Sequence, residues 1–279
     1  MAADIPVEPG LRRVPRQGLV FCFLVAFCIV IWLTAQTGWL EHGSSRDVLV
    51  APGMEHWLGT NEIGQDVLVG LILATPTTLA LATVTAILAG ALALSAASLV
   101  VLGGPLVAGV VLRTVDVLQV VPSMLLLLFV AALVNPGLIA LVLLLTVTGW
   151  SDDVRIVVAV LRREVRRENI LYARAMGAGW IYCWRWHLLA ALRPLVGVVI
   201  VQNLRQAALK SAGLGFLGLT DPRLLTWGSM MQSAMDQLYT GAWIWLLLPP
   251  AFLLSLFLHW ILKLSDPRVQ SGLELEQRL

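Results

Sequence analysis

Residues 67–112 read VLVGLILATPTTLALATVTAILAGALALSAASLVVLGGPLVAGVVL and contain no Asp, Glu, Lys or Arg. Residues 17–40 and 117–151 form two further runs without a charged side chain. Each run reaches the roughly 20 residues that a helix needs to cross the hydrocarbon core of a bilayer. The sequence therefore predicts an all-α integral membrane protein.

The composition agrees with this prediction. Of the 279 residues, 58% are hydrophobic and only 13% are charged, a balance that is unusual for a soluble domain. The formal net charge is +2, so nothing indicates nucleic acid as a partner. Cys22 and Cys28 lie in an apolar run and Cys183 lies in a basic segment. We interpret the three cysteines as reduced packing residues.

The apolar pattern indicates about six membrane-spanning helices, with no internal repeat and no separate soluble domain. An even number of spans places both termini on the same side of the membrane. The predicted spans cover residues 19–35, 76–102, 117–134, 137–160, 190–212 and 241–262.

The distribution of arginines predicts the orientation of these spans. The loops on one side carry only Arg46 and Arg223, so the opposite, arginine-rich side is cytoplasmic. Both termini are then cytoplasmic, as a tail over 1–18 and a tail over 263–279, with the membrane region over 19–262. The segment between the fourth and fifth spans holds most of the arginines, namely Arg155, Arg162, Arg163, Arg166, Arg167, Arg174, Arg185 and Arg193.

Several sequence patterns argue against a nucleotide or metal site in this chain. Gly213, Gly215 and Gly218 spell G-x-G-x-x-G, but they follow a membrane helix and no strand precedes them. These glycines are more typical of a helix end or of closely packed backbones. The four histidines are scattered, and no Gly-rich loop ending in Lys-Ser is present. We therefore expect no catalytic residues, no metal and no cofactor bound by this chain.

The arginine-rich loop contains a short predicted helix with an apolar ridge. Leu171, Tyr172, Ala175 and Met176 would form the ridge, Ala173 keeps one side narrow, and Gly177 supplies a turn. An apolar ridge exposed to water indicates a protein partner. The residues alone fit equally well an interfacial helix that lies on anionic lipid, since arginines and tryptophans surround it.

The chain resembles a known family, the inner-membrane permease subunits of ATP-driven importers for dipeptides, oligopeptides and nickel, and specifically the second of the two paired permeases. Ordered motifs over nearly the whole chain carry the resemblance. They are residues 56–67 (HWLGTNEIGQDV), 113–123 (RTVDVLQVVPS), Trp150 with Arg155, Gly177 with Ala178, 216–219 (FLGL) with 227–230 (WGSM), and 266–268 (DPR).

The resemblance implies a type I ABC importer permease fold in the bacterial inner membrane. It also implies the partners: a homologous second permease, two cytoplasmic ATPase subunits that bind ATP and Mg²⁺, and an extracytoplasmic substrate-binding protein. The loop over about 164–190 would dock into an ATPase subunit and favours the partner interpretation of the ridge. The residues expected at that contact are Glu168, Leu171, Tyr172, Ala173, Arg174, Met176 and Gly177.

Three of the family's motifs are altered in this chain. The Glu-Ala-Ala triplet of the loop is Leu171-Tyr172-Ala173 here, an Asp is replaced by Asn61, and an Arg is replaced by Gln65. Without the acidic residue of the triplet, the ATPase contact would rely on apolar packing and on Glu168 or Arg174.

The fifth predicted span carries an unusual polar stripe. Gln202, Asn203, Gln206 and Lys210 fall within about 100° of a helical wheel, with Arg205 to one side. Polar and charged residues at bilayer depth normally face a protein interior or an aqueous cavity. We hypothesise that the stripe lines the translocation path. The alternative is that Lys210 extends to the outer interface while the amides hold helices together.

Two aspartates lie at the cytoplasmic end of the fourth span. We predict that Asp152 and Asp153 pair with Arg155 or with the arginine-rich loop, and a gate or cation site is the alternative. The expected function is that of an importer permease for short peptides, nickel or metal chelates. A self-sufficient secondary transporter or channel is the rival, but it predicts inverted repeats and midplane ion ligands that the sequence lacks.

Overall fold

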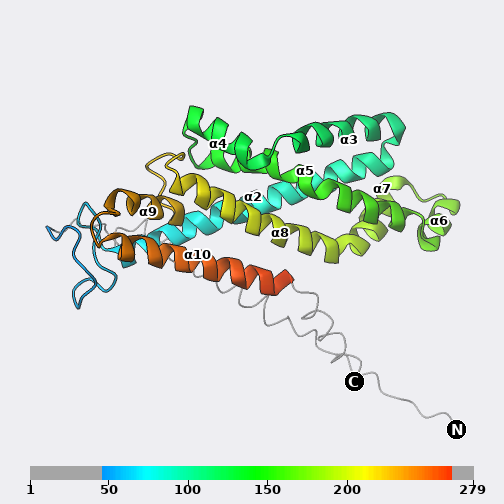
Figure 1. Cartoon of the computed structure of the whole chain (residues 1–279). Helices are drawn as coiled ribbons and strands as arrows, with labels where there is room; N and C mark the ends of the chain where they lie inside the picture. The colour runs from blue at the N-terminus through cyan, green and yellow to red at the C-terminus, as the bar shows by residue number, and fades with distance from the viewer. Residues whose placement is uncertain (1–45, 266–279) are drawn as a thin grey trace, which may run out of the picture.

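The computed structural model describes residues 46–265, and over this range the chain is helical, with one isolated bridge between Thr60 and Asp66. The helices run along the molecule between two ends (Figure 1). They are α2 (Val67–Leu102), α3 (Gly104–Val120), α4 (Ser123–Val134), α5 (Leu138–Val165), α6 (Glu168–Ala175), α7 (Trp180–Cys183), a π-helix (Trp184–Leu188), α8 (Leu189–Phe216), α9 (Trp227–Ser233), a 3₁₀ turn (Met235–Gln237) and α10 (Trp243–Ser265).

The longest helix, α2, begins nine residues before the predicted span at 76. Asp66 caps it, accepting hydrogen bonds from the backbone N–H groups of Leu68 (2.7 Å) and Val69 (3.3 Å). Pro76 lies inside the helix without ending it. With 36 residues, α2 is about 54 Å long, so it extends well beyond a hydrocarbon core of about 30 Å.

The prediction of one continuous helix over 117–134 is wrong. The structure has two helices, α3 and α4, bent by 75° at the break between them. Pro122 has no N–H to continue α3, and its ring holds Val121 in an extended conformation (φ −91°, ψ 124°). Residues 104–116, expected to lie in a connecting loop, are also helical because α3 begins at Gly104.

The other predicted spans agree better with the helices. The span at 137–160 is α5, that at 190–212 lies within α8, and that at 241–262 is α10, each with ends shifted by a few residues. Together with α2, these are the predicted spans whose helices the structure bears out. The first predicted span, 19–35, and both tails lie outside the described residues.

A narrow contact between α2, α5 and α8 forms the centre of the bundle. Small residues on α2 and α8 let these helices approach closely. A Cβ on Gly149 would lie 3.6 Å from Oδ1 of Asn203 and 3.9 Å from Cβ of Ala89, so the three helices meet at this level. The buried glycines and alanines of α2 are Gly70, Ala74, Ala82, Ala86, Ala89, Gly90, Ala93, Ala96 and Ala97.

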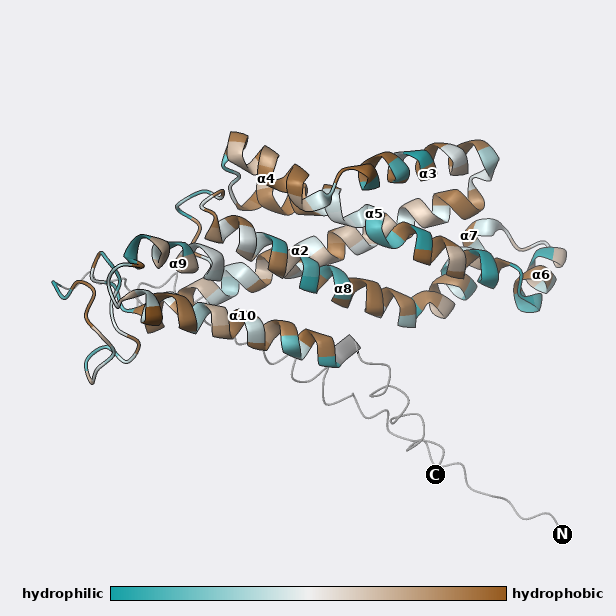
Figure 2. Cartoon of the chain, viewed as in Figure 1, coloured by the Kyte–Doolittle hydropathy of each residue, from teal (hydrophilic) through white to brown (hydrophobic). Residues whose placement is uncertain are grey.

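Three helices of residues 46–265 are long and apolar enough to cross a membrane, and the bent α3–α4 pair would make a fourth. The fifth long helix, α5, has 28 residues but carries Asp152, Asp153 and Arg155 in its second half. Figure 2 shows apolar residues along the bundle and more hydrophilic ones at its two ends. One end holds α6, and the other holds α9 and residues 46–66 (Figure 1). A count of six spans stays a prediction.

Candidate functional site

The helix α6 forms an exposed ridge at one end of the molecule. Leu171, Tyr172 and Met176 are 56%, 67% and 89% exposed, and Ala175 is exposed as well. The neighbouring Ile170 is only 2% exposed and belongs to the same core cluster as Leu161 of α5. One side chain thus anchors α6 to the bundle, and the ridge is left without a partner within the described chain.

A tight turn ends α6 at Gly177, as the sequence predicts. The N–H of Ala178 donates to the C=O of Ala173 and the N–H of Gly177 donates to the C=O of Arg174, both over 3.0 Å. This pair of bonds is a Schellman motif, with glycine at the position that needs a positive φ, here +90°. The turn fixes where the ridge stops.

The arginine of α6 stabilises this turn. The guanidinium of Arg174 lies 4.3 Å from the ring centroid of Trp180 and donates a 3.0 Å hydrogen bond to the C=O of Ala178. Glu168 is exposed in the first turn of α6, where its negative charge interacts favourably with the helix dipole. Of the two charged residues expected at an ATPase contact, Glu168 is the one without an intramolecular contact among residues 46–265.

The polar stripe on α8 divides into two parts. Asn203 is buried, and its Nδ2 donates to Oδ2 of Asp153 on α5 and, over 2.9 Å, to the C=O of Val199. This contact matches the helix-locking alternative. The other four members, Gln202, Arg205, Gln206 and Lys210, are partly exposed.

Arg205 stands out within this second group. Its Nε is buried and has no hydrogen-bond partner among residues 46–265. This atom is not accessible to a second molecule, so only the remaining, exposed part of the Arg205 side chain can meet one. Gln202, Gln206 and Lys210 are likewise partly exposed, which is all that the structure shows of the predicted stripe beyond Asn203.

Asp152 and Asp153 are predicted to pair with Arg155 or with the arginine-rich loop; the pairing with Arg155 is wrong, and no ion pair of either aspartate with the loop occurs among residues 46–265. The guanidinium of Arg155 pairs with Asp116 on α3, and Asp153 bonds to Asn203. Gln119, also on α3, donates a 2.9 Å hydrogen bond to the C=O of Ser151. One turn of α5 thus connects polar groups of α3 on one side and α8 on the other. A helix of period 3.6 places residues 153 and 155 on different faces, which is why they choose different partners.

The G-x-G-x-x-G run ends α8 and lets α9 approach, as predicted. A Cβ on Gly215 would lie 3.0 Å from the backbone N of Ser229, and one on Gly228 would lie 2.5 Å from the C=O oxygen of Ala212. Gly218 has φ +70° and terminates the helix. Gly215 and Gly228 thus let the backbones of α8 and α9 pack together.

Residues 56–67 fold into a compact cap at the opposite end from α6. Thr60 is fully buried, donating to the C=O of Asp47 (2.6 Å) and accepting from the N–H of Val50 (2.9 Å). Nδ1 of His56 lies 3.0 Å from Oδ2 of Asp66. Trp245 of α10 donates to the C=O of Thr60 over 3.3 Å. The sequence identified this motif by resemblance only, and the structure supplies its physical role.

Trp227 of the W-G-S-M motif attaches α9 to α2. Its backbone N–H donates to Oγ1 of Thr78 and its ring Nε1 donates to Oγ1 of Thr75, both over 3.1 Å. Thr226 and Ser229 form a capping box at the start of α9. These hydrogen bonds connect residues about 150 positions apart, so local sequence patterns could not have revealed them.

Known proteins with similar sequences are transport permeases. A di/tripeptide transport system permease protein, DppC, from Pseudomonas aeruginosa is 29% identical over 253 residues, covering 81% of this chain and 77% of the relative. A nickel transport system permease protein, NikC, from Escherichia coli K12 is 28% identical over 223 residues, covering 78% and 80%.

A solved structure shares the fold. A chain of the MetNI methionine ABC transporter, in an inward-facing conformation, superposes with a TM-score of 0.57 at 22% identity, covering 72% of this chain and 95% of that chain. The family described as "Binding-protein-dependent transport system inner membrane component" matches residues 86–271, which is more than half of the sequence. The chain therefore belongs to this family of inner-membrane transport components.

Proposed function

We propose that this chain is the transmembrane permease subunit of an ATP-driven importer in the bacterial inner membrane, acting on short peptides or on nickel or metal chelates. It would form half of a translocation path with a homologous second permease. Two ATPase subunits on the cytoplasmic side would hold ATP and Mg²⁺, and an extracytoplasmic binding protein would deliver cargo. The chain itself would catalyse no reaction.

The exposed ridge of α6 is the observation that carries the coupling part of this proposal. Leu171, Tyr172 and Met176 expose apolar surface at the arginine-rich end. A partner that buries them would gain about 25 cal/mol for each Å² of apolar surface removed from water. Because Ile170 packs in a core cluster that includes Leu161 of α5 and Leu192 of α8, a partner that moves the ridge would also move these two helices.

The partly exposed stripe on α8 supports the path. Gln202, Arg205, Gln206 and Lys210 would face the second permease or the cargo, with Asn203 holding α8 to α5. Two cations on this face disfavour a bare divalent metal ion and favour a carboxylate or an anionic chelate. Transport would follow alternating access between inward-open and outward-open forms.

Co-purification with the ATPase tests the coupling. Tyr172→Glu in the tagged full chain, expressed in its native host, should reduce recovered ATPase at least tenfold, because a charge would have to be desolvated at the contact. Tyr239→Glu is the matched control, since Tyr239 is fully exposed at the other end. Retention of ATPase by the Tyr172 variant would contradict the proposal. Absence of any ATPase with the unmodified chain would favour the self-sufficient transporter.

Uptake by the assembled complex tests the stripe. The double change Arg205→Gln and Lys210→Gln should lower uptake about tenfold and leave ATPase co-purification intact. Lys263→Gln is the control, because Lys263 is exposed at the end of α10. Unchanged uptake in the double variant would remove the stripe from the path.

A further inference from the structure

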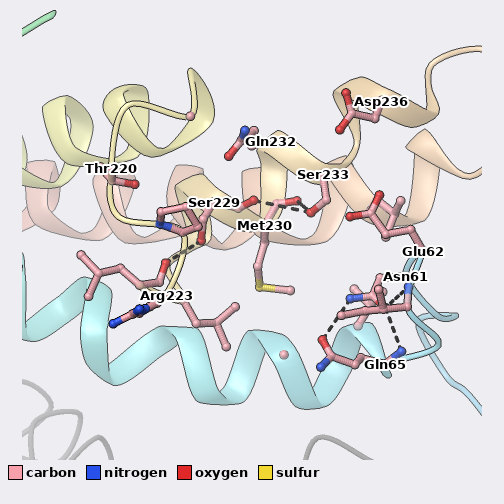
Figure 3. Close-up of a pocket in the computed structure, with 18 of the residues that line it drawn as sticks. Asn61, Glu62, Gln65, Thr220, Arg223, Ser229, Met230, Gln232, Ser233 and Asp236 are labelled. Carbon is pink, nitrogen blue, oxygen red and sulfur yellow. Dashed lines mark hydrogen bonds between the residues drawn. The ribbon is translucent and has the colours of Figure 1, made fainter. Parts of the chain in front are cut away.

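A pocket of about 360 Å³ lies at the end of the molecule opposite α6 (Figure 3). Its walls come from residues 61–67, from the turn that follows α8, and from α9 with the 3₁₀ turn behind it. The arginine distribution predicts that this end is extracytoplasmic. The volume falls within the range of roughly 300 to 1,000 Å³ that small-molecule sites occupy.

Part of the polar lining is committed to the fold. Oδ1 of Asn61 accepts hydrogen bonds from the backbone N–H groups of Ile63 (3.1 Å) and Gln65 (2.8 Å). The carboxylate of Asp66 caps α2, and Oδ1 of Asp221 accepts from the N–H of Arg223 (2.9 Å). These side chains already accept hydrogen bonds that hold the walls of the pocket in place, so they are less available to a ligand.

Four other lining side chains have no such commitment. Glu62, Arg223, Gln232 and Asp236 are exposed, and their side chains make no hydrogen bond or ion pair within the described part of the chain. Figure 3 shows Glu62 and Asp236 toward one end of the pocket and Arg223 toward the other. Opposite charges thus share one pocket without neutralising each other.

This separation of charge identifies a ligand class. A short peptide with free termini carries an ammonium group and a carboxylate, separated by roughly 3.3 to 3.6 Å for each residue. The guanidinium of arginine binds a carboxylate through two parallel hydrogen bonds. The apolar lining, which includes Met230, Leu225 and Leu246, suits uncharged peptide side chains.

We propose that this pocket binds the two termini of a short zwitterionic peptide, with Arg223 on the carboxylate, Glu62 and Asp236 on the ammonium group, and Gln232 on the peptide backbone. The proposal rests on the function proposed above and narrows its cargo from peptides or metals to peptides. A bare metal ion fits less well, because residues 46–265 contain no group of three or more His, Cys, Asp or Glu side chains arranged to hold one.

Direct binding of radiolabelled trialanine tests this site. The probe is added to the permease pair with its ATPase subunits in lipid nanodiscs, without the binding protein, so that only the membrane complex can bind it. We expect saturable binding that weakens about tenfold in Arg223→Gln, the size of one charge-assisted hydrogen bond. Arg46→Gln, at the same end but outside the pocket, should bind like the unmodified chain.

Peptides with blocked termini make the test specific. Trialanine amide lacks the carboxylate, so it should bind about tenfold more weakly to the unmodified complex, and Arg223→Gln should not weaken it further. N-acetyl-trialanine should bind weakly too, with no further loss in the double variant Glu62→Gln, Asp236→Asn. Glu55→Gln is the control for that variant, because Glu55 is exposed and lies outside the pocket.

The outcomes separate this proposal from the one on which it rests. Absence of saturable trialanine binding, or equal binding of the free and blocked peptides, would overturn the peptide site. Co-purified ATPase and ATP hydrolysis in the same sample would show that the importer assignment survives that result. An equal loss for free and amidated peptide in Arg223→Gln would also overturn the assignment of Arg223 to the carboxylate.

Discussion

The two ends of the molecule use the same helix-ending motif in different surroundings. At one end α6 stops at Gly177, and at the other α8 stops at Gly218, where the N–H of Leu219 donates to the C=O of Leu214 and that of Gly218 to the C=O of Gly215, both over 3.0 Å. A Cβ on Gly177 would meet no atom within 4 Å, whereas α9 crowds the glycines of α8. The identical turn is therefore enclosed at one end and open at the other.

The two ends therefore differ in how contacts within the chain hold them. At the α9 end a capping box, Trp227 and the buried Thr60 hold the backbone in place, and the exposed side chains of the pocket lie on this scaffold. The α6 end is held by Ile170, with Ala173 packed beside the same core cluster, and it exposes Leu171, Tyr172 and Met176. Damage to these backbone contacts at the first end should therefore appear as lost stability, and damage to the ridge at the second end should appear as a lost partner.

The largest expected effect is at Gly228. Gly228→Ala would place a Cβ 2.5 Å from the backbone oxygen of Ala212, an atom that cannot move aside without shifting α8. We expect a loss of about 3 kcal/mol in the free energy of unfolding, measured by denaturant titration of the purified full chain in detergent. Gly179→Ala at the other end is the control, since its Cβ would meet nothing within 4 Å. An equal loss in both variants would contradict the comparison.

The next largest effect distinguishes two neighbours on α6. Ile170→Ala removes a buried side chain and should lower the free energy of unfolding by about 2 to 3 kcal/mol. Leu171→Ala removes an exposed one and should change stability by less than about 0.5 kcal/mol while reducing ATPase recovery. The same titration and the co-purification assay measure both. A large stability loss in Leu171→Ala would show that the ridge belongs to the core.

Sequence reasoning recovered the class of fold because a charge-free apolar run is a property of one continuous segment. It also placed the α6 ridge and the Gly177 turn, since both depend on local spacing. It failed at Pro122, where one missing N–H divides a predicted span into α3 and α4. A continuous apolar run does not reveal whether such a break bends the helix.

Contacts between distant segments were beyond sequence reasoning. The pairing of Arg155 with Asp116 instead of the adjacent aspartates depends on which faces of α3 and α5 meet. The pocket beside α9 combines Glu62 with Arg223 and Asp236, and both of these lie more than 150 positions after Glu62 in the sequence. No periodicity in one segment carries that information, and a single sequence offers no other signal for it.

A medium effect is expected from Thr60. Thr60→Val keeps the shape of the side chain and removes the hydroxyl that bonds Asp47 and Val50, so it should cost about 1 to 2 kcal/mol. The loss would appear in the same unfolding titration. Thr240→Val, at an exposed threonine of the same end, should cost clearly less. Equal costs would mean that the hydrogen bonds that hold the cap of residues 56–67 contribute little to the free energy of unfolding.

The smallest effect concerns the two matched glycines. Gly177→Ala and Gly218→Ala each force an alanine to a positive φ, +90° and +70°, which should cost about 1 kcal/mol in either place. At Gly218 the new Cβ would also lie 2.5 Å from Nε2 of Gln232, but that amide is exposed and makes no hydrogen bond, so it can rotate away. The two stability losses should therefore agree within about 0.5 kcal/mol, because the turn determines the cost and the surroundings do not.

The variants should differ in function instead: Gly218→Ala displaces Gln232 from the pocket and should weaken trialanine binding, while Gly177→Ala alters the end of the ridge and should lower ATPase recovery. A much larger stability loss at Gly218 would mean that Gln232 is held in place, and the enclosed end would then extend further toward the pocket.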